Sequence, residues 1–148
     1  MSGKVPKKNS HPGVDVYGRQ PLHFAALEGA RKTARCLLDG GADPSFADDN
    51  GYTPLHFAAQ ERHPTIVRLL LHHGANPNAA DVHGNGPLWT AIMSARGDKQ
   101  CAELLLRAGA DRHHKNAAGR SPFDLALTFK HGWEVLLANE ANPNPPTA

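Results

Sequence analysis

The sequence predicts an all-α solenoid of four helix-turn-helix units joined by β-turn fingers, because two phrases recur in one register. The first phrase is a glycine with a proline three residues later, and it occurs at Gly18–Ala26, Gly51–Ala59, Gly84–Ile92 and Gly119–Leu127. The second ends on Gly-Ala and then Asp or Asn, and it occurs at Leu37–Asp43, Leu70–Asn76 and Leu105–Asp111. The first phrase returns after 33, 33 and 35 residues, a period typical of helical repeat arrays.

The first helix of each unit is predicted to begin at the proline of the first phrase. A proline suits a first turn because its φ is already helical and its missing N–H would have no helical partner there. Thr53 and Ser121 come directly before two of these prolines and can cap free N–H groups. Gln20 and Gly86 cap less well. The predicted helix starts are Pro21, Pro54, Pro87 and Pro122.

A second helix and a finger complete each unit. In the second unit, apolar residues at Ile66, Val67 and 69–71 are spaced to cover one helix face. Gly74 can take the left-handed conformation that ends such a helix. Residues 78–86 then predict a β-turn in which Gly84 is free to adopt a positive φ. One helix pair cannot bury its apolar face alone, so we expect neighbouring units to stack.

The unit boundaries are predicted at about residues 14–47, 48–80, 81–115 and 116–138. The third unit has two extra residues within Ser94–Gln100, which predicts a longer loop between its helices. In the fourth, Trp133–Ala138 occupies the positions of the apolar second helix and no Gly-Ala-Asp phrase follows, which indicates a shortened C-terminal cap. We expect a flexible basic tail at residues 1–13 and a flexible Pro-rich tail at 139–148.

These phrases resemble the ankyrin-repeat family, whose signature is a 33-residue unit built around Thr-Pro-Leu-His-x-Ala. The run Gly51–Ala59 contains that signature, and the resemblance covers about residues 14–138. It implies a rigid scaffold that binds another protein on a concave face made by finger tips and first helices. It also implies that His23 and His56 hydrogen-bond to backbone between neighbouring units.

Composition narrows the class of partner. The chain has 148 residues, which is the size of one domain. Its 16 Lys plus Arg against 14 Asp plus Glu give a formal charge of +2, and so small a charge does not favour a polyanionic partner. No apolar stretch approaches the roughly 20 residues that a membrane span needs, and no secretory signal is apparent. Two cysteines are too few for a disulfide scaffold. We therefore expect a cytoplasmic protein with no membrane partner. We expect a monomer because the sequence indicates a cap at each end of the array.

The histidines and cysteines of the sequence do not have the spacing of a metal site or a catalytic site. Ten histidines are present, but the adjacent pairs at 72–73 and 113–114 do not share a helix face and have no nearby Cys or carboxylate to complete a metal site. Cys36 and Cys101 fall in second helices, where we expect both to be core residues. No phosphate-binding loop, zinc-protease motif or nucleophile elbow occurs. We predict no enzyme activity, no catalytic residue, no metal, no cofactor and no small-molecule substrate.

The resemblance places partner-binding residues on the finger tips and first helices. Tyr, Trp, Met and Arg are the residue types enriched at interface cores and hot spots. Trp89 can instead be packed between first helices in place of the motif histidine, and Tyr17 and Tyr52 can be ordinary exposed finger residues. The predicted partner-binding residues are Tyr17, Arg19, Asp49, Asn50, Tyr52, Glu61, His83, Asn85, Trp89, Met93, Arg96 and Arg120.

The predicted function is a non-catalytic module that binds and masks a partner protein. The run Gly84–Ala91 and the widened third unit resemble small single-domain bacterial ankyrin proteins, some of which are immunity proteins that neutralise a toxin. That resemblance implies occlusion of a cognate toxin's active site or substrate entrance. The alternatives are an intracellular scaffold or adaptor, and a nucleic-acid-binding protein that uses Lys4, Lys7, Lys8 and 112–115. The near-neutral charge counts against nucleic acid.

Overall fold

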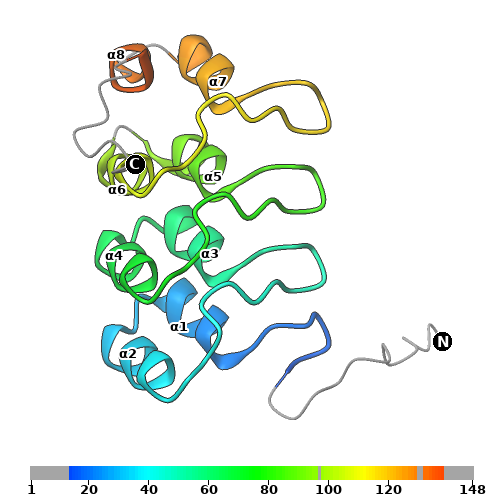
Figure 1. The fold of residues 1–148 in the computed structure, drawn as a ribbon, viewed down its shortest axis with the longest axis vertical. Helices are drawn as coiled ribbons and strands as arrows, with labels where there is room; N and C mark the ends of the chain where they lie inside the picture. The colour runs from blue at the N-terminus through cyan, green and yellow to red at the C-terminus, as the bar shows by residue number, and fades with distance from the viewer. Residues whose placement is uncertain (1–13, 97, 130–131, 139–148) are drawn as a thin grey trace, which may run out of the picture.

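The computed structural model describes residues 14–96, 98–129 and 132–138. Within these ranges the chain forms eight α-helices and no β-strand, which confirms the predicted all-α solenoid. The helices form stacked pairs, and Figure 1 shows the first helices in one layer, the second helices in another, and the fingers projecting on the side opposite the second helices. The helices are α1 Pro21–Glu28, α2 Arg31–Asp39, α3 Pro54–Gln60, α4 Pro64–His72, α5 Pro87–Ser94, α6 Gln100–Arg107, α7 Pro122–Phe129 and α8 Trp133–Ala138.

The first helices begin where the sequence predicts, and the two predicted caps form. The backbone N–H of His56 donates to Thr53 Oγ1 at 3.4 Å at the start of α3. At α7 the capping is reciprocal, because Asp124 N–H donates to Ser121 Oγ at 3.2 Å while Ser121 N–H donates to Asp124 Oδ2 at 2.8 Å. These bonds satisfy N–H groups at the starts of α3 and α7 that have no partner within the helix.

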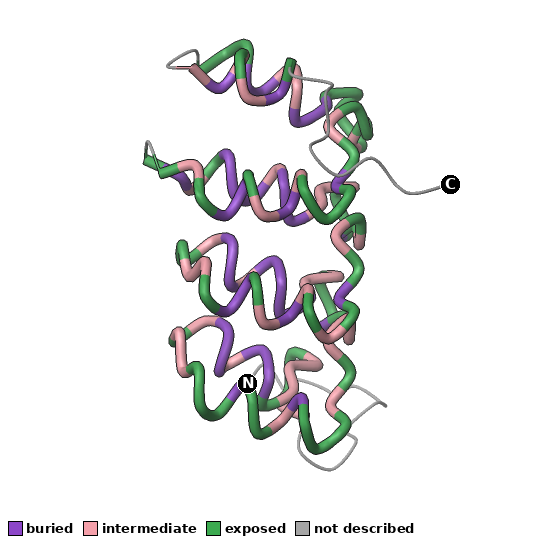
Figure 2. Tube along the Cα trace, turned by 60° about the vertical axis from the view of Figure 1, so that its left-hand side comes forward, coloured by how far each residue is buried: buried purple, intermediate pink, exposed green. Residues whose placement is uncertain are grey.

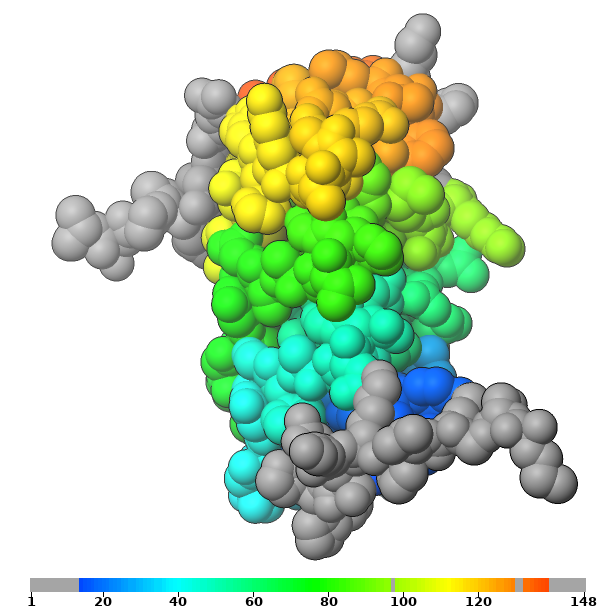
Figure 3. Space-filling model, turned by 90° about the vertical axis from the view of Figure 1, so that its right-hand side faces the viewer, coloured from blue at the N-terminus to red at the C-terminus, as the bar shows by residue number. Residues whose placement is uncertain are grey.

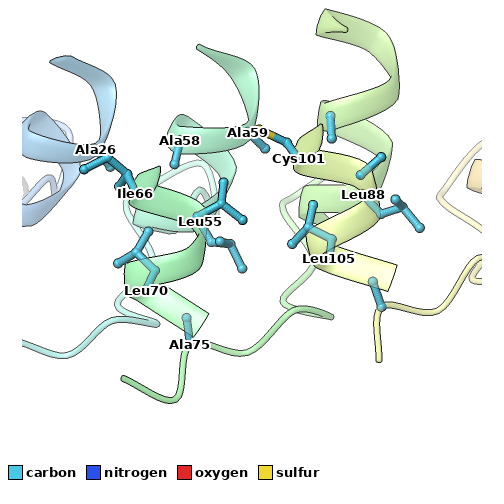
Figure 4. Packing of buried hydrophobic residues seen from close by; sticks show 14 of the residues in the cluster. Ala26, Leu55, Ala58, Ala59, Ile66, Leu70, Ala75, Leu88, Cys101 and Leu105 are labelled. Carbon is cyan, nitrogen blue, oxygen red and sulfur yellow. The ribbon is translucent and has the colours of Figure 1, made fainter. Parts of the chain in front are cut away.

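The core lies between successive helix pairs. α3 packs between α1 and α5, and α4 packs between α2 and α6. Figure 4 shows Leu55, Ile66, Leu70 and Leu105 in the layers between neighbouring helices, and each is at most 1% exposed. Buried alanines such as Ala59 let adjacent first helices approach closely. In Figure 2 the buried positions recur along every first helix, so each repeat depends on its neighbours for burial.

The two extra residues of the third repeat lie between its helices, as predicted. α5 ends at Ser94 and α6 begins at Gln100, whereas α3 ends at Gln60 and α4 already begins at Pro64. The tails predicted at 1–13 and 139–148 lie outside the described residues.

The prediction that both cysteines are core residues is wrong for Cys36, which is exposed, while Cys101 is buried. The two do not share a register. Cys101 lies 35 residues after the buried Ile66, whereas Cys36 lies 33 residues before Leu69, which is only partly buried. Among the described residues, α4 is the second helix that packs on α2. Cys36 therefore occupies a register that is only partly covered even inside the array, as Leu69 shows.

Candidate functional site

Each finger is a five-residue turn that begins at an Asp or Asn and carries its own internal clamp. The side-chain Oδ1 of that residue accepts backbone N–H bonds from the residues two and four positions later, at 2.8 to 3.0 Å. The fourth residue is a glycine with φ between 76° and 78°. Each finger therefore keeps its shape without a bound partner. The fingers are Asp15–Arg19, Asp48–Tyr52, Asp81–Asn85 and Asn116–Arg120.

Neighbouring fingers are joined by backbone hydrogen bonds. Asp49 N–H donates to Tyr17 O at 2.9 Å, and Val82 N–H donates to Asn50 O at 3.0 Å. Ala117 N–H extends the series by donating to His83 O at 2.9 Å. Figure 3 looks onto the fingers and shows that they form one continuous face of the molecule.

Two buried histidines tie the first helices to the next finger, as the family resemblance implies. His56 Nδ1 accepts the Thr53 N–H at 3.1 Å, so its Nε2–H is the donor to Asn85 O at 2.9 Å. His23 makes the same pair of bonds with Gln20 N–H and Tyr52 O, both at 3.0 Å. Burial lowers the pKa of both histidines below the ordinary value, which keeps the imidazoles neutral and in this tautomer.

A groove opens between the first three fingers, and we call it the finger groove. It has a volume of about 520 Å³. The Tyr52 ring lies in this groove stacked on the His56 ring, with centroids 4.8 Å apart, and it meets the Phe57 ring edge-on at 5.3 Å. The lining residues are Tyr17, Arg19, Asp48, Asn50, Tyr52, Phe57, Val82 and His83.

The charged groups of the finger groove are already engaged within the protein. Arg19 Nη2 and Asp15 Oδ2 form an ion pair at 2.8 Å, and the same guanidinium lies 4.8 Å from the centre of the Tyr17 ring. The Asp48 carboxylate accepts the N–H groups of Asn50 and Tyr52. The groove therefore offers aromatic and apolar surface together with the polar side chains of Asn50 and His83.

The predicted partner-binding residues occupy several distinct places. Five of them line the finger groove: Tyr17, Arg19, Asn50, Tyr52 and His83. Asp49 is exposed on the second finger, and Arg120 on the fourth finger donates to Thr128 Oγ1 at 3.0 Å. Asn85 and Trp89 line a small cleft that faces the fourth repeat, and Glu61, Met93 and Arg96 line a groove at the loops between helices.

Asn85 and Trp89 hold the third repeat against the fourth. The Asn116 side-chain amide donates to Asn85 Oδ1 at 2.9 Å. Trp89 is partly buried against the core and shares its cleft with His114 and Pro122. Trp89 thus packs in the position where the earlier repeats place a histidine.

Three groove residues were outside the predicted set: Asp48, Phe57 and Val82. The sequence carries a signal for Asp48, since an Asp or Asn lies three residues before the finger glycine in every unit. Phe57 follows the motif histidine on the first helix, and Val82 lies next to a predicted residue. Both are apolar residues, and the sequence does not show whether an apolar residue at these positions lies in the core or in a groove.

The described residues contain no group of three or more His, Cys, Asp or Glu side chains arranged to hold a metal ion. Among the helices that the structure describes, none combines the length and apolar character that crossing a bilayer requires.

Comparison with known families agrees with this architecture. A family model described as ankyrin repeats in three copies matches residues 4–81, and a model of the single ankyrin repeat matches residues 83–117. No curated protein matches the chain. The first match begins before the boundary predicted at residue 14 and spans more than half of the sequence. The four-unit period, the paired helices with clamped fingers and these two matches together establish that the chain belongs to the ankyrin-repeat family.

Proposed function

We propose that this chain is a non-catalytic protein-binding module whose finger groove covers part of a partner protein. Ankyrin repeats are protein-interaction modules, and membership of the family supports this general class. The observation that carries the proposal is the finger groove of about 520 Å³, whose tyrosines and polar side chains stand on finger backbones held by hydrogen bonds within and between fingers.

The exposure of its apolar side chains and the rigidity of its fingers both favour the finger groove as the binding surface over the other finger residues. Tyr17 is 45% exposed and Val82 is 62% exposed, so two large apolar groups flank the groove in the free protein. Interfaces gain most from aromatic anchors that are already ordered before binding, because little conformational entropy is then lost. The Asx clamps and the inter-finger bonds supply that order here.

The partner class that we propose is a toxic enzyme, and the support is the sequence resemblance to bacterial immunity proteins. A rigid surface that lies over an active site or a substrate entrance inhibits by occlusion and needs no catalytic group of its own. A scaffold or adaptor is the alternative, and it would hold two proteins at once instead of inhibiting one.

The test is affinity capture from the source lysate followed by binding and inhibition assays with the purified partner. The informative variant is Tyr17→Ala/Val82→Ala, since both side chains are exposed and their removal leaves the core intact. Leu127→Ala/Val135→Ala is the matched control, because it removes exposed apolar side chains from the fourth repeat. We expect the first variant to weaken binding by at least about tenfold, the range of an interface hot spot, and the control to bind normally.

If both variants bind the partner equally well, the finger groove is not the binding surface. A captured enzyme that loses activity in the complex would support occlusion. A complex with two other proteins bound simultaneously, and no inhibition, would instead favour the scaffold.

A further inference from the structure

Two arginines adopt a backbone conformation that favours glycine, and both lie at the loops between helices. Arg62 has φ 58° and Arg96 has φ 45°, and they are the only non-glycine residues with positive φ in the described part of the chain. Arg62 follows α3 in repeat 2, and Arg96 follows α5 in repeat 3. In the corresponding turn of repeat 1 the left-handed residue is Gly29, with φ 70°. At the position of Arg62 the turn can therefore be made by glycine and does not require a long cationic side chain.

The two arginines line one groove, which we call the loop groove. It has a volume of about 360 Å³ and is separate from the finger groove. Its lining residues are Gln60, Glu61, Arg62, Met93, Ser94 and Arg96. In Figure 2 the loops between helices stack along one edge of the molecule, so residues from successive repeats meet there.

The cationic groups of the loop groove have no partner among the described residues. Both arginines are exposed, and neither side chain forms an ion pair or a hydrogen bond with another described residue. The one acidic side chain of the groove, Glu61, accepts a hydrogen bond from the Gln60 amide at 3.2 Å. Met93 adds an apolar surface that is 54% exposed. This arrangement differs from Arg19 in the finger groove, whose charge is paired with Asp15.

We propose that the loop groove is a second binding site, and that it takes an acidic segment of a partner protein that places an apolar side chain on Met93. A guanidinium binds a carboxylate through two parallel hydrogen bonds, and a methionine adapts its shape to different apolar groups. A polyanionic nucleic acid fits less well, because its phosphate backbone offers no apolar side chain for Met93 and the chain's formal charge is only +2. The inference goes beyond the proposed function, since it does not depend on the finger groove.

The test is a titration of the isotope-labelled full chain with short peptides, followed by NMR. The probe is the capped peptide Glu-Glu-Leu-Glu-Glu, and the comparison peptides are Glu-Glu-Ser-Glu-Glu and Lys-Lys-Leu-Lys-Lys. We expect the first peptide to shift the signals of Arg62, Met93 and Arg96, with weaker binding when serine replaces leucine and none for the basic peptide.

The informative variant is Arg62→Gly/Arg96→Gly, because glycine adopts a positive φ without strain, as Gly29 does at the position equivalent to Arg62. Arg68→Gln/Arg107→Gln is the charge-matched control, since it removes two exposed arginines from α4 and α6. We expect the glycine variant to bind the acidic peptide at least about threefold more weakly, and the control to bind as the parent does at moderate salt. Tyr17→Ala/Val82→Ala should leave peptide binding unchanged, which separates this site from the finger groove.

Four results would overturn the proposal. One is equal weakening in both arginine variants, which indicates general charge attraction. Another is a set of shifts that lies outside the loop groove. A third is no shift up to about 10 mM acidic peptide, a range in which even weak sites are occupied. The last is a short oligothymidylate that binds the loop groove more tightly than the acidic peptide.

Discussion

The first residue of each finger supports that finger through one side-chain oxygen. Asp48 is 9% exposed, and its Oδ1 accepts the N–H groups of Asn50 and Tyr52 at 2.9 and 2.8 Å. The fourth finger makes the same two bonds with the amide oxygen of Asn116. The acceptor geometry, and not the negative charge, is therefore what the four fingers share.

Replacement of Asp48 tests this role. Asp48→Ala removes both acceptors and is expected to lower the free energy of unfolding by about 2 kcal/mol, whereas Asp48→Asn should cost less than about 1 kcal/mol. Urea denaturation followed by circular dichroism measures both. An equal loss in the two variants would show that the carboxylate charge matters more than the hydrogen bonds.

The two cysteines should differ in reactivity. Burial raises the pKa of the Cys101 thiol to about 11, whereas Cys36 is exposed. Because the thiolate is the nucleophile, we expect a thiol reagent at neutral pH to modify Cys36 rapidly and Cys101 only when the protein unfolds. Timed alkylation and mass spectrometry of the native chain check this, with labelling in denaturant as the control. Equal native rates would contradict the burial of Cys101.

Within an element, the finger glycines are not equivalent. Gly51 and Gly119 have φ of 78° and 76°, so both carry the left-handed conformation. A Cβ on Gly51 would lie 2.8 Å from Asp81 Cα in the next finger, while a Cβ on Gly119 would have nothing within 4 Å. The difference arises because Gly51 has a neighbouring finger over it.

This difference predicts unequal costs for the same substitution. Gly119→Ala should cost about 1 to 2 kcal/mol of unfolding free energy, the penalty for a Cβ in the left-handed region. Gly51→Ala should cost at least about 1 kcal/mol more, because backbone must also shift to relieve the overlap. Denaturant unfolding of the pair gives the comparison. Equal costs would mean that the fingers separate easily.

At the scale of the whole molecule, the buried histidines make stability depend on pH. Burial lowers the pKa of His23 and His56 from an ordinary value of 6.5, although Asp48 raises it in part. Between the lowered values and 6.5 the unfolded chain binds more protons than the folded chain. Stability is therefore retained above pH 6.5 and falls as the pH drops below it.

Urea unfolding at pH 7.5, 6.5 and 5.5 measures this dependence. We expect the midpoint to fall with acidification, and the fall to be smaller in His56→Gln even though that variant is less stable throughout. His72→Gln serves as the control because His72 is exposed. A pH profile that is unchanged in His56→Gln would assign the effect to other groups.

The sequence after Ala138 contains a further copy of part of the repeat pattern. Residues 140–144 read Glu-Ala-Asn-Pro-Asn, and residues 74–78 read Gly-Ala-Asn-Pro-Asn. The second phrase of the repeat therefore recurs after Ala138, without its glycine. The predicted fourth boundary at 138 falls before this phrase.

The sequence by itself determined the fold, the helix starts and the place of the insertion. These features depend on local chemistry. Pro54 fixes its own φ at a helical value, and Thr53 caps the first turn of the same helix. Gly29 adopts a left-handed φ at little cost because it has no Cβ. The recurrence of such signals at one period leaves few architectures open. The backbone role of His56 also came from a motif that recurs in one register.

Only the tertiary structure decided which exposed residues share a surface. Tyr17 and Val82 flank one groove because three fingers are hydrogen-bonded side by side, while Met93 meets Arg62 and Arg96 at another groove formed by different loops. Exposure of Cys36 follows its register, because the corresponding Leu69 is only partly buried even with helices packed on both sides of α4. In a stacked array, conformation is fixed within a repeat, but burial and binding surfaces are made between repeats.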